Sequence, residues 1–253
     1  MTVIAMPREL ATRGKDVALG VAEELGLEVV HRELVERDLA GRMDVDQGAV
    51  HQFLEGKPSL WNRWKIDRRK LSRYTAEEML DLATKGNVLI RGWGAVTLLR
   101  SVPHVICVRV CAPTEFRVEV LMDRLDLKCA DTARREIEKN DDAHMLSAQR
   151  RNVHDWTNAE NFDLILNTKR VPLADCVAQI KQLATSDAFS ETSQSRKLLL
   201  DMLTEASKIL CHSTMTLNFS TITRMNCLSR VLSRRERLNL FFISRAGVLL
   251  SSR

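Results

Sequence analysis

Residues 2–25, TVIAMPRELATRGKDVALGVAEEL, decide the fold, because this one stretch predicts a strand, a charged turn and a helix. Residues 2–6 are a short apolar run with β-branched side chains, which is typical of a buried strand. Apolar residues then repeat at helical spacing over residues 16–25. The turn between them contains Gly14 and Lys15. Such a turn can bind phosphate, because backbone N–H groups and a helix N-terminus converge on an anion.

The alternation of strand and helix continues along the chain. We expect further strands at residues 27–30, 87–91, 104–111 and 163–167, and further helices at residues 31–40, 95–99, 113–125 and 172–183. The run Val105-Ile-Cys-Val-Arg-Val-Cys111 is almost continuously apolar, as expected for a parallel strand covered on both faces. The sequence therefore predicts an α/β protein with a parallel sheet and helices on both faces.

Two segments interrupt this alternation, and the composition changes near the end of the chain. Residues 46–74 and 131–156 are expected to be insertions over the ligand-binding edge of the sheet. We expect the α/β domain to span residues 1–185 and a Ser/Thr-rich linker to span 186–195. Residues 196–253 are expected to form one helix and an irregular, poorly ordered basic tail.

Charge is distributed unevenly along the 253 residues. Eight of the 38 Lys and Arg residues, but one of the 33 Asp and Glu residues, follow residue 206, so the preceding part carries 30 basic and 32 acidic residues. The main body therefore does not favour a nucleic-acid partner. Nucleic-acid binding through the basic tail is a separate hypothesis, which predicts an affinity that falls steeply with salt. No apolar run is long enough for a membrane span, so a cytoplasmic protein without a membrane partner is expected.

The turn after the first strand matches a phosphate-binding motif only in part. Against G-x-x-x-x-G-K-[ST], Gly14 and Lys15 agree, whereas Glu9 replaces the first glycine and Asp16 replaces the hydroxyl residue. From these residues alone, a phosphate loop and a plain strand-to-helix turn both remain open.

Several longer stretches of the sequence, taken in their order along the chain, resemble those of a known family. They are Pro7-Arg-Glu9, Val30-His-Arg-Glu-Leu34, Val88-Leu-Ile-Arg-Gly-Trp-Gly-Ala95, Cys111-Ala-Pro-Thr-Glu-Phe-Arg117, the charged residues 134–141, Asp155-Trp156 and Phe162-Asp-Leu-Ile-Leu-Asn-Thr168. Over about residues 2–184 the chain resembles the cytidylate kinase-like family. The resemblance implies a three-layer P-loop nucleoside-monophosphate kinase fold with a monophosphate-binding insertion and a lid. It also implies transfer of the ATP γ-phosphoryl group to CMP or dCMP, with Mg²⁺.

The chain departs from the family in the phosphate loop. The family's loop resembles S-R-E-x-G-S-G-G-R-E, and this chain has Ala11 and Arg13 in place of two of its glycines. If these positions require positive φ, a Cβ costs about 1 kcal/mol or more, and Arg13 could fill the anion site itself. His31 and His144 replace an acidic residue and a lid arginine that are common in the family. The alternative is therefore a catalytically impaired nucleotide-binding sensor or interaction module.

We assign candidate roles to the residues around the loop and the strand ends. ATP would be bound by Arg13, Gly14, Lys15 and Asp16; catalysis would use Lys15, Arg134 and Arg135; the acceptor nucleotide would be bound by His31, Glu33, Arg91, Gly92 and Trp93; and Mg²⁺ would be held by Asp16. Arg91 is chosen because it leaves a strand at the carboxyl end, where open α/β sheets bind ligands. Simpler alternatives remain for several: a solvated first-turn lysine for Lys15, a dipole-favoured acid for Asp16 and a solvated helix face for the lid arginines.

Overall fold

The computed structural model describes residues 1–30, 32–54, 68–92, 94–149 and 157–209. The chain divides into two units, Met1–Ala206 and Ser207–Arg253.

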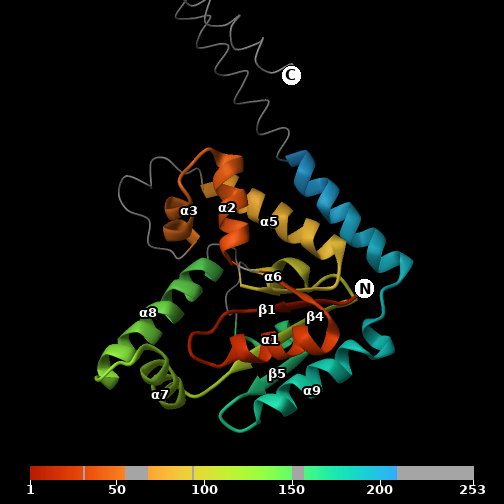
Figure 1. Cartoon of the computed structure of the whole chain (residues 1–253). Helices are drawn as coiled ribbons and strands as arrows, with labels where there is room; N and C mark the ends of the chain where they lie inside the picture. The colour runs from red at the N-terminus through yellow and green to blue at the C-terminus, as the bar shows by residue number, and fades with distance from the viewer. Residues whose placement is uncertain (31, 55–67, 93, 150–156, 210–253) are drawn as a thin grey trace, which may run out of the picture. The chain divides into compact units, whose positions relative to one another are not determined.

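The first unit is built on one parallel sheet in the strand order β2-β3-β1-β4-β5 (Figure 1). The strands are β1 (Val3–Met6), β2 (Glu28–Val30), β3 (Val88–Arg91), β4 (Val105–Cys111) and β5 (Leu164–Asn167). The first strand is central: Ala5 is paired with Ile90 of β3 on one side and with Cys107 of β4 on the other. Each strand lies within the range predicted from the sequence. The loop that follows β1 therefore leaves from the middle of the sheet's carboxyl edge.

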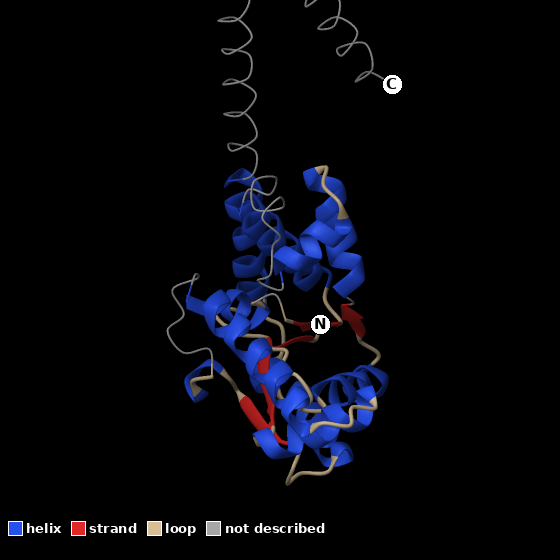
Figure 2. Ribbon diagram, turned by 90° about the vertical axis from the view of Figure 1, so that its left-hand side faces the viewer, coloured by secondary structure: helices blue, strands red, loops and turns tan. Residues whose placement is uncertain are grey.

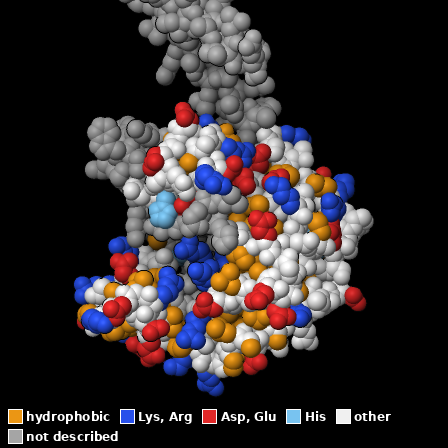
Figure 3. Space-filling model, in the orientation of Figure 1, with side chains coloured by type: hydrophobic (Ala, Val, Ile, Leu, Met, Phe, Trp, Pro, Cys, Tyr) orange, Lys and Arg blue, Asp and Glu red, His pale blue; other side chains and the backbone are white. Residues whose placement is uncertain are grey.

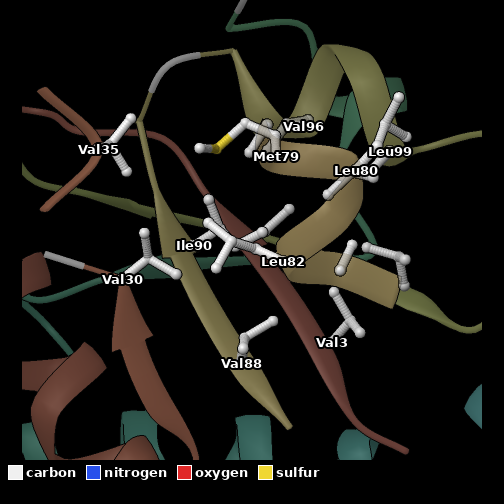
Figure 4. Packing of buried hydrophobic residues seen from close by; sticks show 14 of the residues in the cluster. Val3, Val30, Val35, Met79, Leu80, Leu82, Val88, Ile90, Val96 and Leu99 are labelled. Carbon is white, nitrogen blue, oxygen red and sulfur yellow. The ribbon is translucent and has the colours of Figure 1, made fainter. Parts of the chain in front are cut away.

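Helices cover both faces of the sheet, as Figure 2 shows. They are α1 (Gly14–Leu25), α2 (Arg32–Met43), α3 (Gln47–Leu54), α5 (Arg68–Lys85), α6 (Ala95–Leu99), α7 (Thr114–Leu125), α8 (Ala130–Gln149) and α9 (Leu173–Ala184). Alternate residues of β1 point to opposite faces: Val3 packs with α2, α5 and α6, and Ile4 packs with α1 and α9. The first of these two cores is shown in Figure 4. The predicted three-layer α/β fold is thus confirmed.

The two predicted insertions are largely helical where they are described. The first contains α3 and the start of α5, and residues 55–67, with Trp61 and Trp64, lie outside the described residues. The second contains α8, and residues 150–156 lie outside. Although its sequence shows little apolar periodicity, α8 buries Ala133 and Ile137, one turn apart, against α7.

The first unit extends beyond residue 185, where we expected the domain to end. Residues 187–189 form a short 3-10 turn and residues 193–209 form a helix that begins in this unit. Leu199 of that helix is almost fully buried in the core on the α6 side. The helix start is fixed by reciprocal bonds, because each of Thr192 and Ser195 accepts a backbone N–H of the other. Residues 210–253, which include most of the expected tail, lie outside the described residues.

Within the described part of the chain, no helix is both long enough and apolar enough to pass through a bilayer.

Candidate phosphate-binding site

The loop between β1 and α1 holds two side-chain-bearing residues in the left-handed region. Ala11 has a φ of 60° and Arg13 has a φ of 55°. These are the two positions at which the sequence comparison with the family expects glycine. A left-handed conformation costs an L-residue roughly 1–2 kcal/mol, whereas glycine adopts it freely. The loop therefore keeps the backbone shape of a glycine-containing loop without those glycines.

The loop leads directly into the N-terminus of α1. The N–H groups of Asp16 and Val17 donate to the Arg13 carbonyl at 3.0 and 3.1 Å, which begins the helix. Gly14 is the first helical residue, and a Cβ there would lie 3.3 Å from Thr12 Oγ1 and 3.7 Å from Arg91 Nη2. Gly14 thus faces both the loop and the end of β3. Backbone N–H groups in a first helical turn lack helical partners and are suited to binding an anion.

The buried loop residue Thr12 forms two hydrogen bonds that hold the loop in place. Its hydroxyl donates to the Glu9 carbonyl at 3.0 Å, and its carbonyl accepts from the Thr168 hydroxyl at 2.8 Å. Thr168 follows β5 and donates its own N–H to the Cys111 carbonyl at 3.1 Å. The residue between the two strained positions is therefore anchored to the ends of β4 and β5.

Glu9 is also buried, and its charge is balanced within the protein. Arg109 of β4 donates from Nε to Glu9 Oε1 at 2.6 Å and from Nη1 to the Thr157 carbonyl at 2.8 Å. This carboxylate occupies the position at which a P-loop has its first glycine. Because Glu9 is already paired with Arg109, it cancels little of the positive charge of the other arginines near the loop.

Arg91 has no such partner among the described residues. It ends β3, and its Nε is buried with no hydrogen-bond partner. Burial lowers the pKa of Arg91 to about 10; repulsion from Arg8 and Arg124 contributes to the lowering, and Asp16 opposes it. No ion pair of Arg91 with a carboxylate is present in the described part of the chain. A partly buried cation in this setting favours an incoming anion.

Gly92 permits the close approach of Arg8 to this edge of the sheet. Its φ is 94°, and a Cβ there would lie 3.3 Å from Arg8 Cδ. Its N–H donates to the Met6 carbonyl at 2.8 Å, so the backbone stays bonded to β1 beyond the last strand residue. In the space-filling view, Lys and Arg side chains gather in a hollow beside α8 (Figure 3).

The remaining loop residues predicted to bind ATP are exposed. Lys15 and Asp16 occupy the first turn of α1, and Lys15 forms no ion pair with any described residue. The Arg13 guanidinium lies 5.6 Å from the centroid of the Phe116 ring, and Lys169 Nζ lies 5.5 Å from the same centroid. Two cations thus share one aromatic ring next to the loop.

The two predicted catalytic arginines lie on α8. Arg134 donates from Nη2 to Glu115 Oε2 of α7 at 2.7 Å, and this contact raises the pKa of Arg134 and lowers that of Glu115. Arg135 is exposed. Their catalytic role stays a prediction.

Three predicted acceptor-site residues cannot be placed with their side chains. His31 and Trp93 lie outside the described residues, and Glu33 lies in α2 with a side chain that the structure does not describe. Of the predicted residues, the structure brings Arg13, Gly14, Asp16, Arg91 and Gly92 to one end of the sheet.

Sequence reasoning missed the residues that hold the loop in place. Thr12 and Thr168 carry no motif of their own, and their contact joins residues 156 positions apart. Arg109 did give a signal, because it is the one charged residue in an otherwise apolar buried strand. A buried charge requires a partner, and Glu9 in the loop is the partner that this signal could have identified.

A parallel sheet of this strand order, whose central strand leads through a loop into the N-terminus of a helix, places the chain in the class of P-loop kinase-like α/β proteins. A profile of the cytidylate kinase-like family matches residues 3–170. The chain belongs to this family, which confirms the resemblance noted in the sequence.

Similar proteins agree with this membership. A cytidylate kinase of Pyrobaculum islandicum is 26% identical over 181 residues, which is 70% of this chain and 89% of that protein. A cytidylate kinase of Pyrobaculum neutrophilum is 27% identical over 180 residues, with the same two shares. Among solved structures, an uncharacterized protein from Eubacterium ventriosum matches with a TM-score of 0.58 and 15% identity, covering 74% of this chain and 99% of that one. This last likeness supports the fold alone.

Proposed function

We propose that the protein transfers the γ-phosphoryl group of ATP to a pyrimidine nucleoside monophosphate, CMP or dCMP. The observation that carries this proposal is Arg91, a partly buried cation that has no ion pair with a described carboxylate and faces Gly14 of the phosphate loop. Family membership and the relatives named cytidylate kinase support the choice of a nucleotide substrate.

The loop residues would bind the donor phosphates. The first N–H groups of α1 would cradle them, and the exposed Lys15 would neutralise charge on the β- and γ-phosphates. Arg13 would add a cation at a position that is glycine in the family's loop. In the transfer, an oxygen of the acceptor phosphate bonds to the γ-phosphorus while the bond to the bridging oxygen breaks, and ADP leaves. Positioning and charge neutralisation suffice for this chemistry, so no protein nucleophile is required.

Asp16 is the residue that fits Mg²⁺ in this arrangement. Its carboxylate is exposed on the first turn of α1 and lies close enough to Arg91 to favour that group's charged form. It belongs to no group of three or more possible protein ligands in the described part of the chain. This suits Mg²⁺, which commonly takes one or two carboxylates and completes its shell with phosphates and water. When bound, the ion would neutralise charge on the transferring phosphate.

Arg91 would bind the phosphate of the acceptor where it meets the donor. Its guanidinium lies between the end of β3 and the loop, so it can reach the junction of the two phosphates. We expect Arg91→Lys to raise the KM for CMP several-fold and to change the KM for ATP little, because an ammonium cannot bind phosphate through two donors. A change confined to the KM for ATP would move Arg91 to the donor site.

The direct test is a coupled ADP-release assay with CMP, dCMP, UMP and AMP as acceptors. Turnover with CMP and dCMP above UMP and AMP is the expected result. Preference for AMP would contradict the pyrimidine assignment and keep the kinase assignment.

A second candidate function is a nucleotide-binding sensor or interaction module without turnover. The left-handed Ala11 and Arg13 favour it, because Arg13 places a guanidinium beside the loop where a glycine-containing loop is open. Binding of ATP, measured by calorimetry, without ADP release for any of the four acceptors would support this function over the kinase.

A further inference from the structure

The phosphate loop shares a small hydrophobic core with α7 and α8. The members of this cluster are Leu10 and Ala11 of the loop, Val118 and Leu121 of α7, and Ala133 and Ile137 of α8. Ala11 is 6% exposed, so its methyl group lies inside the cluster. A glycine at this position would have no side chain to contribute. Ala11, whose positive φ strains the backbone, therefore also attaches the loop to α7 and α8.

Arg117 makes the polar part of the same connection. This α7 side chain is 7% exposed; its Nε donates to the Leu10 carbonyl at 2.8 Å, and Nη1 and Nη2 donate to the two carboxylate oxygens of Asp141 on α8, each at 2.8 Å. Leu10 directly precedes the left-handed Ala11. The Arg117 guanidinium thus binds the Leu10 carbonyl, next to the strained Ala11. It also binds the middle of α8 through two charge-assisted hydrogen bonds to Asp141.

We propose that Arg117 is a positioning residue that couples the conformation of the phosphate loop to the position of α8. If α8 shifts, Arg117 must give up either Asp141 or the Leu10 carbonyl, because the guanidinium is planar and its donors have fixed directions. Anything that orders the loop then orders α8, and the coupling acts equally in the opposite direction. The proposal deepens the proposed function, since α8 carries Arg134 and Arg135.

The test uses the full-length protein and the variants Asp141→Asn and Asp141→Glu, with Asp142→Asn as the matched control. Asp142 is the exposed neighbour on the same helix, with no ion pair among the described residues. Hydrogen–deuterium exchange would be followed in residues 7–13 and 130–149 without ligand, and sodium tripolyphosphate affinity would be measured by calorimetry.

Asp141→Asn should speed exchange in the loop about tenfold, the effect of losing about 1.4 kcal/mol of a charge-assisted contact. It should weaken tripolyphosphate binding by a similar factor, whereas Asp141→Glu should retain most of both properties and Asp142→Asn all of both. Faster exchange in α8 with an unchanged loop would overturn the proposal, because Arg117 would then only anchor the helix. Should Asp141→Asn fail to fold, Arg117→Lys, which keeps the charge but not the paired donors, should give the same loop effect.

The exchange measurement separates this proposal from the proposed function. It needs no ligand, so a wild-type protein that binds neither tripolyphosphate nor ATP would contradict the kinase function while the coupling could still be seen. Conversely, full turnover in Asp141→Asn with wild-type loop exchange would contradict the coupling alone.

Discussion

Replacing Arg91 by methionine should stabilise the protein without ligand and weaken its response to CMP. Methionine keeps much of the length and apolar surface of arginine but carries no charge. The buried Nε without a partner, and the repulsion from Arg8 and Arg124, would both disappear.

The magnitude follows from the pKa of this group. Burial and the neighbouring cations lower the pKa of Arg91 to about 10. Relative to an ordinary arginine, this lowering corresponds to about 3 kcal/mol against the charged form in the folded protein. We expect Arg91→Met to recover about 1–2 kcal/mol of it in the free energy of unfolding, since the replacement packs imperfectly and loses the attraction of Asp16.

Urea denaturation at pH 7.5 in a buffer without phosphate would measure this change, and thermal shifts with CMP would measure acceptor binding. Arg37→Met on α2 is the matched control, because Arg37 is exposed and forms no ion pair within the described residues. The control should stay within about 0.5 kcal/mol of the wild type and keep the full thermal shift.

Two results would refute this reasoning about Arg91. A loss of more than about 1 kcal/mol in Arg91→Met would show that the guanidinium is satisfied in the free protein. An undiminished thermal shift with CMP would show that the acceptor phosphate binds away from Arg91, and the proposed acceptor site would then be wrong.

Three further predictions concern the loop and the helix at residues 193–209. Lys15→Ala should lower kcat by roughly 100-fold with little change in CMP affinity, because a cation at the γ-phosphate acts in the transition state. Unchanged steady-state kinetics would exclude that role, and Lys197→Ala is the control. Thr168→Val should lower the free energy of unfolding by about 1–3 kcal/mol, measured in urea, because the buried Thr12 carbonyl loses its donor; an equal stability would mean that water replaces it. Burial lowers the pKa of His104, so the neutral form is favoured in the folded state. The free energy of unfolding should therefore be highest above about pH 6.5 and fall as the pH drops below that value. His104→Gln should remove this pH dependence in the same urea series.

The fold could be predicted because its signals are local. Apolar runs such as residues 105–111 and helical repeats such as residues 17–25 depend on neighbours in sequence, and both elements form where they were expected. The helix at residues 193–209 shows the limit of such signals. The sequence predicted a helix from residue 196, set apart from the α/β domain by a linker, because composition does not show that Leu199 is buried with residues far away in sequence.

The sequence predicted candidate residues at the loop and at the end of a strand, but not the residues that hold the loop in place. Gly14 and Arg91 were predicted because one matches a motif position and the other ends a strand at the expected ligand-binding edge; the structure places them close together, and their roles stay a prediction. The residues that hold the loop were not found. Arg117 stood in the sequence as the last residue of the stretch 111–117, whereas its side chain reaches back to the loop carbonyl of Leu10, a contact between residues 107 positions apart.

Ala11 and Arg13 show how a loop can lose two glycines and keep its shape. Each left-handed residue costs about 1 kcal/mol or more. Burial of the Ala11 methyl returns about 0.8 kcal/mol, and the contact of Arg13 with Phe116 returns about 0.5–1 kcal/mol. These gains offset part of the cost, and the same contacts change how the loop is held. A glycine-containing loop is free to adjust around phosphate, whereas this loop is fixed by its own side chains before any ligand arrives, which reduces the ordering cost of binding and restricts the ligands that fit.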